Sequence, residues 1–358
     1  QTKLDGLPLG QEKWFLDMVA LGTVCDIMEQ TIENRQNIFW GLKVLSKTRR
    51  AGLKSMLALA GVKEPKSSTL GFIIGPRINS AGRLETAEKA LDLMLENDAF
   101  VAFEKPKNLD DLNKKRRKIQ HEALEIAIQK AKDFENNKVL VLADESFNDG
   151  IIGIVASGLL ERFKKPVFVI SIEGEIAKGS ARSFGGFSAS QAVDKAREII
   201  IKGGGHDAAA GVTLPTLKID EFRKIVNNFY DSLNLKNQLE YLLPKVDIQL
   251  EDFSPISLEL FEKITALEPF GKGNEEPTFE IKKVRVIARQ EMGYKKQHLK
   301  LTLTDGENEI KMLKFNAPEE FFAEIGEEID VVFSLGLNEW QGQKNVEGQI
   351  LHLERKRV

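Results

Sequence analysis

The spacing of apolar residues changes twice along the chain, and the first of the three resulting regions has helical spacing. Between residues 11 and 60 apolar side chains recur every three or four positions, as in the run from Trp14 to Val19. Gly61 interrupts this pattern. Helical spacing returns over residues 77–95, and a long polar helix is predicted over 108–134.

The second region alternates between strands and helices. Short apolar runs at 139–143 and 166–170 have the length and composition of buried strands, and 179–183 would end a third strand. Residues 149–156 are typical of a turn that enters an apolar helix, with Asp149 as a helix cap. Strands that alternate with helices predict a small α/β domain here.

The last region consists of short segments in which apolar and polar residues alternate, the period of a strand with one buried face. The turn signal Thr304-Asp305-Gly306 separates the second segment from the third. Short strands with turns between them predict a small β-barrel of the OB type, and the five segments are residues 284–288, 298–303, 310–315, 329–334 and 349–353.

Composition narrows the class of protein. With 358 residues, 42% of them hydrophobic and 29% charged, the chain has enough apolar material for two or three globular domains. No apolar run reaches the length of a membrane span, so we expect no membrane partner. A single cysteine, Cys25, excludes an internal disulfide and fits a reducing, cytoplasmic location. Because the sequence opens on Gln1 without an initiating methionine, we expect a piece of a longer protein.

The charge balance gives little guidance about partners. The net charge of −3 argues against a uniformly basic nucleic-acid binder, but phosphate binding depends on local patches. Between residues 281 and 315 basic residues outnumber acidic ones, and Tyr294 and Phe315 lie among them. A barrel face that binds a single strand needs this mixture, although a merely soluble barrel can have it as well.

A glycine-rich block at residues 203–211, GGGHDAAAG, is the strongest candidate for contact with a ligand. Gly204 and Gly205 let the backbone approach a ligand with no Cβ in the way, and exposed N–H groups in such a turn attract anions. His206 would donate a hydrogen bond to a phosphate or shuttle a proton. The alanines that follow are expected to start a tightly packed helix, and a plain turn before that helix is the alternative reading.

Two further clusters have the chemistry of phosphate ligands. Arg77, Asn79 and Arg83 fall within about one turn of a predicted helix, where guanidinium and amide groups suit phosphate and sugar oxygens. Their alternative role is pairing with acids that follow on the same helix. Ser180 and Arg182 lie two positions apart on a predicted strand, so both project from one face. A hydroxyl beside a guanidinium suits a terminal 5′-phosphate, although strand edges carry such residues for other reasons too.

Five sequence blocks, in this order, carry a family resemblance. They are LGTVCD at 21–26, PRINSAGR at 76–83, GSARS at 179–183, GGGHDAAAG at 203–211 and LEPFGKGN at 267–274. Together they resemble the C-terminal portion of the RecJ single-strand DNA exonucleases, members of the DHH phosphoesterase superfamily. The resemblance implies an α/β multidomain fold, with the end of a DHH-type α/β domain at residues 1–97, a helical connector at 98–136, an α/β DHH-associated domain at 137–232 and an OB-fold barrel at 233–358.

The resemblance also implies a metal-dependent exonuclease that degrades single-stranded DNA from the 5′ end during recombination and repair. Asp26 would be a ligand of Mn²⁺ or Mg²⁺, carboxylate oxygen being the ligand these ions prefer. Arg77 and Asn79 would hold phosphates near the scissile bond, and His206 would brace the strand. The other substrate-binding residues would be Arg83, Ser180, Arg182, Gly204 and Gly205. The expected partners are single-stranded DNA with a 5′ end, a single-strand-binding protein and a helicase.

The sequence departs from the family at its beginning. An aspartate-rich first motif, a second aspartate and the Asp-His-His motif do not precede the block at 21–26. Two-metal cleavage needs several ligands that hold two ions roughly 3.5–4 Å apart, which Asp26 alone cannot do. We therefore expect the chain to be inactive unless residues upstream of it supply the other ligands. A DHH-type phosphodiesterase of short oligonucleotides, against which the predicted barrel counts, and a non-catalytic nucleic-acid-binding scaffold are the alternatives.

Overall fold

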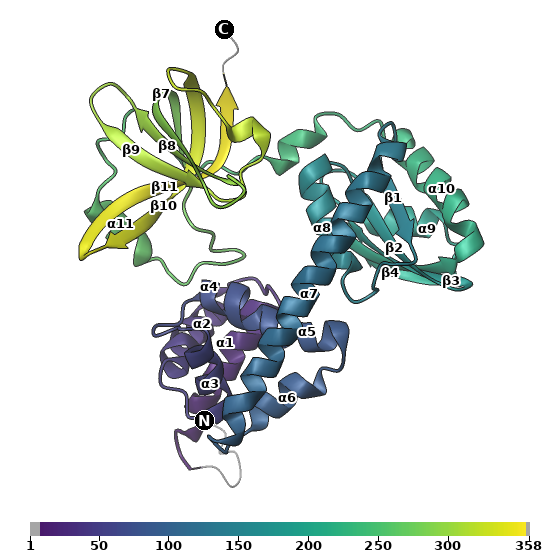
Figure 1. Ribbon diagram of the computed structural model, residues 1–358, viewed down its shortest axis with the longest axis horizontal. Helices are drawn as coiled ribbons and strands as arrows, with labels where there is room; N and C mark the ends of the chain where they lie inside the picture. The colour runs from purple at the N-terminus through teal and green to yellow at the C-terminus, as the bar shows by residue number, and fades with distance from the viewer. Residues whose placement is uncertain (1–7, 356–358) are drawn as a thin grey trace. The chain divides into compact units, whose positions relative to one another are not determined.

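The computed structural model describes residues 8–355 (Figure 1). The chain forms two compact units, one containing the residues up to Val44 together with those from Leu243 onward, and the other containing Leu45–Leu242. The boundaries of the four predicted domains stay a prediction.

The predicted helical region is confirmed, because every regular element from residue 11 to residue 134 is a helix. The first unit contains the short helix η1 Gln11–Phe15, α1 Leu16–Cys25 and most of α2 Ile32–Leu45. The second unit continues with α3 Ala51–Leu59, α4 Ser67–Thr69, the π-turn η2 Leu70–Ile74, α5 Gly75–Leu84, α6 Glu88–Leu95, α7 Val101–Ala131 and η3 Lys132–Phe134.

The long helix α7 links the helical part of the second unit to its sheet. Its N-terminal half packs against α5, and its C-terminal half packs against α8 Ile152–Phe163 (Figure 1). Small residues, among them Ala123 and Ala127, make the second contact close by leaving no bulky side chain between the helices. Because of this packing, α5 and the sheet belong to one compact unit.

The predicted α/β domain is present as a five-stranded sheet with the strand order β1-β2-β3-β5-β4. β1 and β2 are parallel and all other neighbours are antiparallel. The strands are β1 Leu140–Asp144, β2 Val167–Glu173, β3 Ile176–Arg182, β4 Lys202–His206 and β5 Ala209–Pro215, and the remaining helices are α9 Ala189–Lys195, η4 Thr216–Lys218, α10 Ile219–Ser232 and η5 Gln238–Leu242.

The two faces of this sheet are covered unequally. On one face, Ala181 of β3 and Val212 of β5 pack in a buried cluster with residues of α9 and α10, such as Phe222. On the other face, Val167 and Val169 of β2 pack with residues of α7 and α8. Helix α8 contacts β2 and β3. The outer half of that second face, formed by β3, β5 and β4, is therefore left open beside α8.

The expectation of a helix after the glycine block is wrong. The alanines belong to β5, which pairs with β4 in a hairpin. Alternate residues of β5, Ala210, Val212 and Leu214, are buried, so the run has the period of a strand and not of a helix. Gly205 permits the tight hairpin, since its φ is 156° and a Cβ there would lie 2.3 Å from the carbonyl oxygen of Ala209.

The predicted OB barrel is confirmed, with its five strands in the predicted places. They are β7 Phe279–Met292, β8 His298–Thr304, β9 Glu309–Lys314, β10 Glu328–Trp340 and β11 Gln343–Arg355. Pairing of β10 with β7 closes the barrel, and β11 runs parallel to β9. Three short elements were not predicted, namely β6 Ile248–Leu250, which adds to β7, α11 Leu258–Thr265 and η6 Glu319–Phe321.

Apolar side chains of all five barrel strands form one core, in which the rings of Phe279 and Phe333 stack with centroids 5.8 Å apart. Among the described residues, no helix combines the length and apolar character that crossing a bilayer requires.

Candidate functional site

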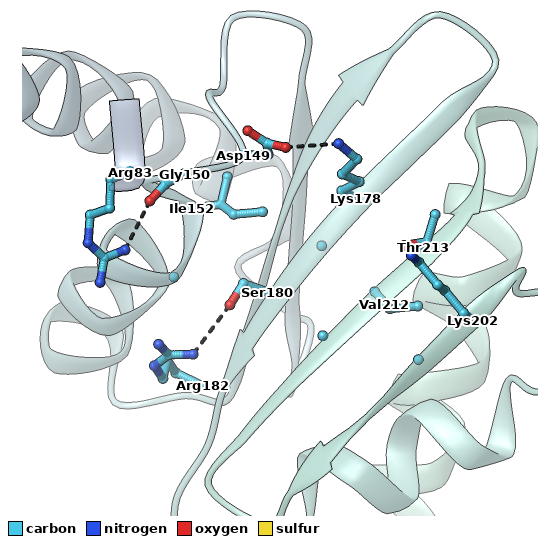
Figure 2. Close-up of a pocket in the computed structure, with 14 residues that line it drawn as sticks. Arg83, Asp149, Gly150, Ile152, Lys178, Ser180, Arg182, Lys202, Val212 and Thr213 are labelled. Carbon is cyan, nitrogen blue, oxygen red and sulfur yellow. Dashed lines mark hydrogen bonds and ion pairs between the residues drawn. The ribbon is translucent and has the colours of Figure 1, made fainter. Parts of the chain in front are cut away.

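A pocket of about 620 Å³ lies on the open half of the sheet, beside the first turn of α8 (Figure 2). Its floor comes from β3, β5 and β4, and one wall comes from the loop and first turn that lead into α8. Arg83, from the end of α5, forms part of the rim. The first N–H groups of a helix lack acceptors within the helix, so this wall presents hydrogen-bond donors and a positive dipole end to the pocket.

Ser180 and Arg182 point from β3 into this pocket, as their two-residue spacing predicted (Figure 2). Nη1 of Arg182 donates a hydrogen bond of 3.3 Å to Oγ of Ser180, which places the guanidinium over the serine. A Cβ on Gly153 would lie 3.0 Å from Nη2 of Arg182 and 3.1 Å from Oγ of Ser180. The absence of a side chain at Gly153 therefore lets both groups sit directly against the first turn of α8.

Arg83 connects the helical part of the unit to the pocket. Its Nη1 donates a hydrogen bond of 2.9 Å to the carbonyl oxygen of Gly150. A Cβ on Gly150 would lie 1.9 Å from the carbonyl oxygen of Arg83, so this close approach of two backbones requires glycine. The Arg83 guanidinium is thereby held at the mouth of the pocket, in a position that does not depend on a ligand.

Arg83 and Arg182 line the pocket, and the guanidinium of Arg116 lies near enough for Arg83 to affect its pKa. Burial, followed by the positive charge of Arg83, lowers the pKa of Arg182 below its ordinary value. Burial and the charges of Arg83 and Arg117 do the same to the pKa of Arg116. Within residues 8–355, neither Arg83, Arg116 nor Arg182 forms an ion pair with an acid. An anion bound here would supply the missing negative charge.

Asp149 is the one acid in the pocket lining, and it is paired. Its carboxylate accepts a hydrogen bond of 2.9 Å from Nζ of Lys178, and this bond raises the pKa of the lysine. The reading of Asp149 as a helix cap is wrong, since α8 starts after Ile151 and has no side-chain cap. Asp149 instead fixes Lys178 of β3 at the side of the pocket.

Arg77 and Asn79 lie on α5 as predicted but are not part of the pocket lining. Nε of Arg77 donates a hydrogen bond of 2.9 Å to Asp110 of α7, and Nη1 donates one of 2.7 Å to the carbonyl oxygen of Ile73. Asn79 is exposed. Of the three residues in this block, Arg83 alone reaches the pocket, and a phosphate-binding role for the other two stays a prediction.

The glycine block contributes to the pocket mainly through its backbone. Gly203 and Gly211 line the floor, and a Cβ on Gly204 would meet no atom within 4 Å. His206 is exposed at the end of β4. Asp207, which sequence reasoning did not single out, accepts a hydrogen bond of 2.6 Å from Ser188, the N-cap of α9. This bond ties the tip of the hairpin to the rest of the domain.

Asp26 lies in the other unit, at the C-terminal end of α1, and is exposed. Its neighbour Cys25 is half-buried, and burial raises the pKa of that thiol to about 11, which makes it a packing residue. The described residues contain no cluster of His, Cys, Asp and Glu side chains that could hold a metal ion. One carboxylate does not fit a two-metal site, so no chemical step through a metal follows from these residues.

The LEPFGKGN block fastens the entry of the barrel to the turn that follows Asp26. The backbone N–H of Gln30 donates to the carbonyl oxygen of Lys272 at 2.7 Å, and Nη2 of Arg35 donates to that of Leu267 at 2.7 Å. Nδ2 of Asn274 closes the loop on itself with a bond of 2.8 Å to Pro269. We call Gln30, Arg35, Leu267 and Lys272 the clasp.

The barrel exposes aromatic side chains next to its strands. Tyr294 is fully exposed in the loop between β7 and β8, and Phe315 is exposed after β9 with its ring 5.4 Å from that of His298. Trp340, the last residue of β10, is exposed as well. Sequence patterning had indicated the first two and missed Trp340, which ends a strand without any signal of exposure.

Comparisons with known proteins agree with this fold. The family model of the DHHA1 domain matches residues 136–232, and that of the RecJ OB domain matches residues 246–352. The chain is 33% identical, over 92% of its own length and 42% of the relative's, to the single-stranded-DNA-specific exonuclease RecJ of Bacillus subtilis. It is 30% identical to the RecJ of Thermus thermophilus, over 98% of its own length and 49% of the relative's.

Crystal structures of RecJ from Thermus thermophilus in complex with Mn²⁺ and with Mg²⁺ superpose with TM-scores of 0.82 and 0.83. At 28% identity, the matches cover 99% of this chain and 51% and 54% of those chains. The two family models thus define the class of protein as a DHHA1 domain followed by a RecJ OB domain. With these domains and its match to RecJ exonucleases over more than nine-tenths of its length, the chain belongs to the RecJ family. It spans about half the length of the relatives that it matches.

Proposed function

We propose that the pocket holds the terminal 5′-phosphate of single-stranded DNA and that the chain is the strand-binding part of a RecJ-type 5′-to-3′ exonuclease. The observation that carries this proposal is the corner formed by Arg83, Ser180 and Arg182 at the start of α8, which holds guanidinium groups without a paired acid. The relatives are named single-stranded-DNA-specific exonucleases, which agrees with a nucleic-acid end as the ligand.

A phosphomonoester fits this corner better than other anions. It carries a charge of about −1.5 to −2 at neutral pH and several acceptor oxygens. Two guanidinium forks, one hydroxyl and the N-terminal N–H groups of α8 supply donors from three sides. A carboxylate ligand would leave some of these donors without an acceptor.

The barrel supports the proposal that the ligand is a longer strand. OB barrels bind single strands through aromatic stacking and positive charge. In this barrel Tyr294, in a loop, and Trp340, at the end of β10, are exposed. A phosphodiesterase of short oligonucleotides would have no need of such a surface. Action in recombination and repair, with a single-strand-binding protein and a helicase as partners, belongs to the same proposal.

We propose that the described residues do not hydrolyse the strand by themselves. We propose that Asp26 is one ligand of a site for Mn²⁺ or Mg²⁺ whose other ligands are supplied by residues that precede this chain in the complete enzyme. The chain alone would then bind single-stranded DNA without cleaving it.

The test compares binding of 5′-phosphorylated and 5′-hydroxyl single-stranded DNA to the full chain by fluorescence anisotropy. We expect the phosphorylated strand to bind about tenfold more tightly, as for one or two charge-assisted hydrogen bonds. Arg182→Gln should abolish the preference. The matched control Arg162→Gln changes an exposed arginine at the other end of α8 and should keep it.

Equal affinity of the two strands for the unmodified chain would overturn the phosphate assignment. Incubation of the same chain with Mn²⁺ and labelled DNA tests the second part of the proposal. Release of nucleotides by a homogeneous preparation would show that the chain has a complete catalytic site. Equal affinity for a dinucleotide and for a long strand would favour the phosphodiesterase of short oligonucleotides.

A further inference from the structure

Strands β10 and β11 continue beyond the barrel as a two-stranded arm. β10 pairs with β7 only from Glu328 to Phe333, and β11 pairs with β9 only at Gly348 and Gln349. Over residues 336–347 these two strands pair with each other and with no third strand among the described residues. We call residues 336–347 the arm, which belongs to the hairpin labelled β10 and β11 in Figure 1.

One face of the arm consists of neutral polar side chains and an indole ring. Asn338 pairs with Asn345, and Trp340 pairs with Gln343, so the alternation of side chains along the strands places these four on one face. All four are exposed, and the exposed fraction of Trp340 is 72%. Val346 belongs to the opposite face and packs against the barrel core, so the four side chains lie on the outer surface. We call them the arm face.

The base of the arm face carries a buried carboxylate. Glu347 pairs with Gly336 on the same face and is 5% exposed. Its Oε1 accepts a hydrogen bond of 3.0 Å from Nδ2 of Asn338 and lies 3.4 Å from Nζ of Lys300, which belongs to β8. The carboxylate therefore neutralises Lys300 and orients the amide group of Asn338.

A strand held through its phosphates does not suit this surface. The arm contains two acids, Glu339 and Glu347, against one base, Lys344. A phosphodiester offers acceptors and a negative charge, so its binding is favoured beside cations and disfavoured beside a carboxylate. The loop that carries Tyr294 differs, because two lysines follow the tyrosine directly. The barrel thus places positive charge at that loop and not on the arm.

Nucleobases suit the arm face in both respects. An amide side chain donates and accepts hydrogen bonds, as the edge of a base does. The indole of Trp340 offers an apolar ring on which any base can stack. We propose that the arm face binds bases of the single strand and that the phosphodiester backbone at this place is turned toward the solvent. This inference deepens the proposed function and rests on it, since it takes single-stranded DNA as the ligand of the barrel.

The test measures binding of two strands of equal length to the full chain by fluorescence anisotropy, at several salt concentrations. One strand is oligothymidylate and the other is abasic, and both carry a 5′-hydroxyl group so that a preference for a terminal phosphate does not enter. Trp340→Leu keeps an apolar side chain and removes the ring. We expect this variant to bind oligothymidylate about tenfold less tightly, as for one stacked base, and to bind the abasic strand as the unmodified chain does.

The salt dependence of binding separates contacts to bases from contacts to phosphates. Each phosphate contact on a single strand changes the slope of log affinity against log salt concentration by about −0.7. Loss of a base contact leaves this slope unchanged, so Trp340→Leu should keep the slope of the unmodified chain. Asn345→Lys places a cation on the arm face and should steepen the slope no more than Asn108→Lys does. That control makes the same change at an exposed position of α7.

The outcomes distinguish this inference from the proposed function. No loss of affinity in Trp340→Leu, an equal loss for both strands, or a slope for Asn345→Lys that is steeper by about 0.7 than that of Asn108→Lys would overturn the binding of bases by the arm. None of these results affects the pocket for the terminal phosphate, which is tested with 5′-phosphorylated DNA. Failure of the unmodified chain to bind oligothymidylate would overturn the barrel's part of the proposed function and this inference with it. A loss confined to oligothymidylate, with unchanged slopes, would support the inference.

Discussion

The guanidinium of Arg35 donates a hydrogen bond of 2.7 Å to the carbonyl oxygen of Leu267, which lies 232 positions further along the chain. With the bond from Gln30 to Lys272, it fastens the barrel entry to the turn after Asp26. The LEPFGKGN block therefore has a structural use that does not involve nucleic acid. It fixes the backbone close to Asp26, which we propose as a metal ligand.

Removal of the clasp should destabilise the unit that contains it. Arg35→Met leaves the carbonyl oxygen of Leu267 with Nδ2 of Asn274, 3.2 Å away, as its donor, and we expect a loss of about 0.5–1.5 kcal/mol for this exposed bond. Lys47→Met changes an exposed side chain just after α2 and should have little effect. Calorimetric unfolding of the full chain measures both, and equal transition temperatures for the two variants would contradict the importance of the clasp.

Substitution of Gly153 by alanine should weaken ligand binding without lowering the stability of the fold. Alanine is favoured over glycine inside a helix by about 1 kcal/mol, so Gly153→Ala should not lower the melting temperature. Its Cβ would push against Arg182 and Ser180, 3.0 and 3.1 Å away, and should weaken the binding of 5′-phosphorylated DNA. Gly158→Ala, on the same helix, meets only Leu124 at 3.5 Å and should leave binding unchanged. Similar affinities for both variants would show that the first turn of α8 does not face the ligand.

Alanine substitutions at the adjacent glycines Gly204 and Gly205 of β4 should affect different properties: the first ligand binding, the second stability. Gly205→Ala places a Cβ 2.3 Å from the carbonyl oxygen of Ala209 at a φ of 156°, and we expect a loss of about 1–3 kcal/mol in stability. Gly204→Ala meets no atom within 4 Å and should fold normally. Because Gly204 pairs with Gly211, which lines the pocket floor, its alanine variant should bind 5′-phosphorylated single-stranded DNA less tightly. Urea unfolding and calorimetric titration test the pair, and a stable Gly205→Ala would contradict the hairpin geometry.

The stability of the barrel should fall in acid because of Asp305. Burial opposes ionisation of its carboxyl group, but backbone N–H donors outweigh burial and lower the pKa of Asp305 to about 2; the donors belong to Phe253, Asn308 and Glu307. A carboxyl group with a lowered pKa in the folded state stabilises the fold above its unfolded value near 4. This contribution is lost as the pH falls from about 4 to about 2.

Urea unfolding of the full chain at several pH values between 5 and 2 measures this effect. Asp305→Asn should flatten the decrease in stability over that range, because the group that titrates is gone. Glu339→Gln, at an exposed position near the end of β10, provides the control. An unchanged pH dependence in Asp305→Asn would mean that other carboxylates, such as Asp144 with its pKa of about 2, dominate acid unfolding.

The exposed aromatic residues of the barrel should matter for long strands alone. Base stacking on an aromatic side chain contributes about 1–3 kcal/mol for each base. Tyr294→Ser and Trp340→Ser should therefore weaken the binding of a long single strand and leave thymidine monophosphate binding unchanged. Tyr241→Ser, an exposed tyrosine outside the barrel, is the control. Unaltered binding of the long strand in both barrel variants would place the strand elsewhere.

Much of the fold follows from local pattern. The helical spacing before residue 134 and the alternation after residue 279 each identify their elements, because one buried face repeats with the period of the element. The pair Ser180 and Arg182 was placed on one strand face for the same reason. The helix predicted over positions 208–211 was wrong because short side chains give no clear preference between helix and strand. Packing of β5 against α9 and α10 decides between them.

The composition of the pocket depends on long-range pairing, which a single sequence does not reveal. Arg77 and Arg83 lie on the same helix, and the position of Asp110 on α7 decides which of them is held in an ion pair. Lys178, Thr213 and Lys202 come from three strands and meet through the register of the sheet. None of these relationships has a local signature, so they were found only in three dimensions.

The place of β4 in the sheet has a consequence for ligand length. β4 is the last strand in the order, so the pocket floor ends at an open sheet edge instead of a wall. A site closed on every side accepts only ligands of one size, whereas a floor that stops at an edge grips the first units of a polymer and leaves the remainder free to continue. If the pocket holds a 5′ end as proposed, strand order would let strands of any length enter it, while the barrel would supply the added affinity of a long strand.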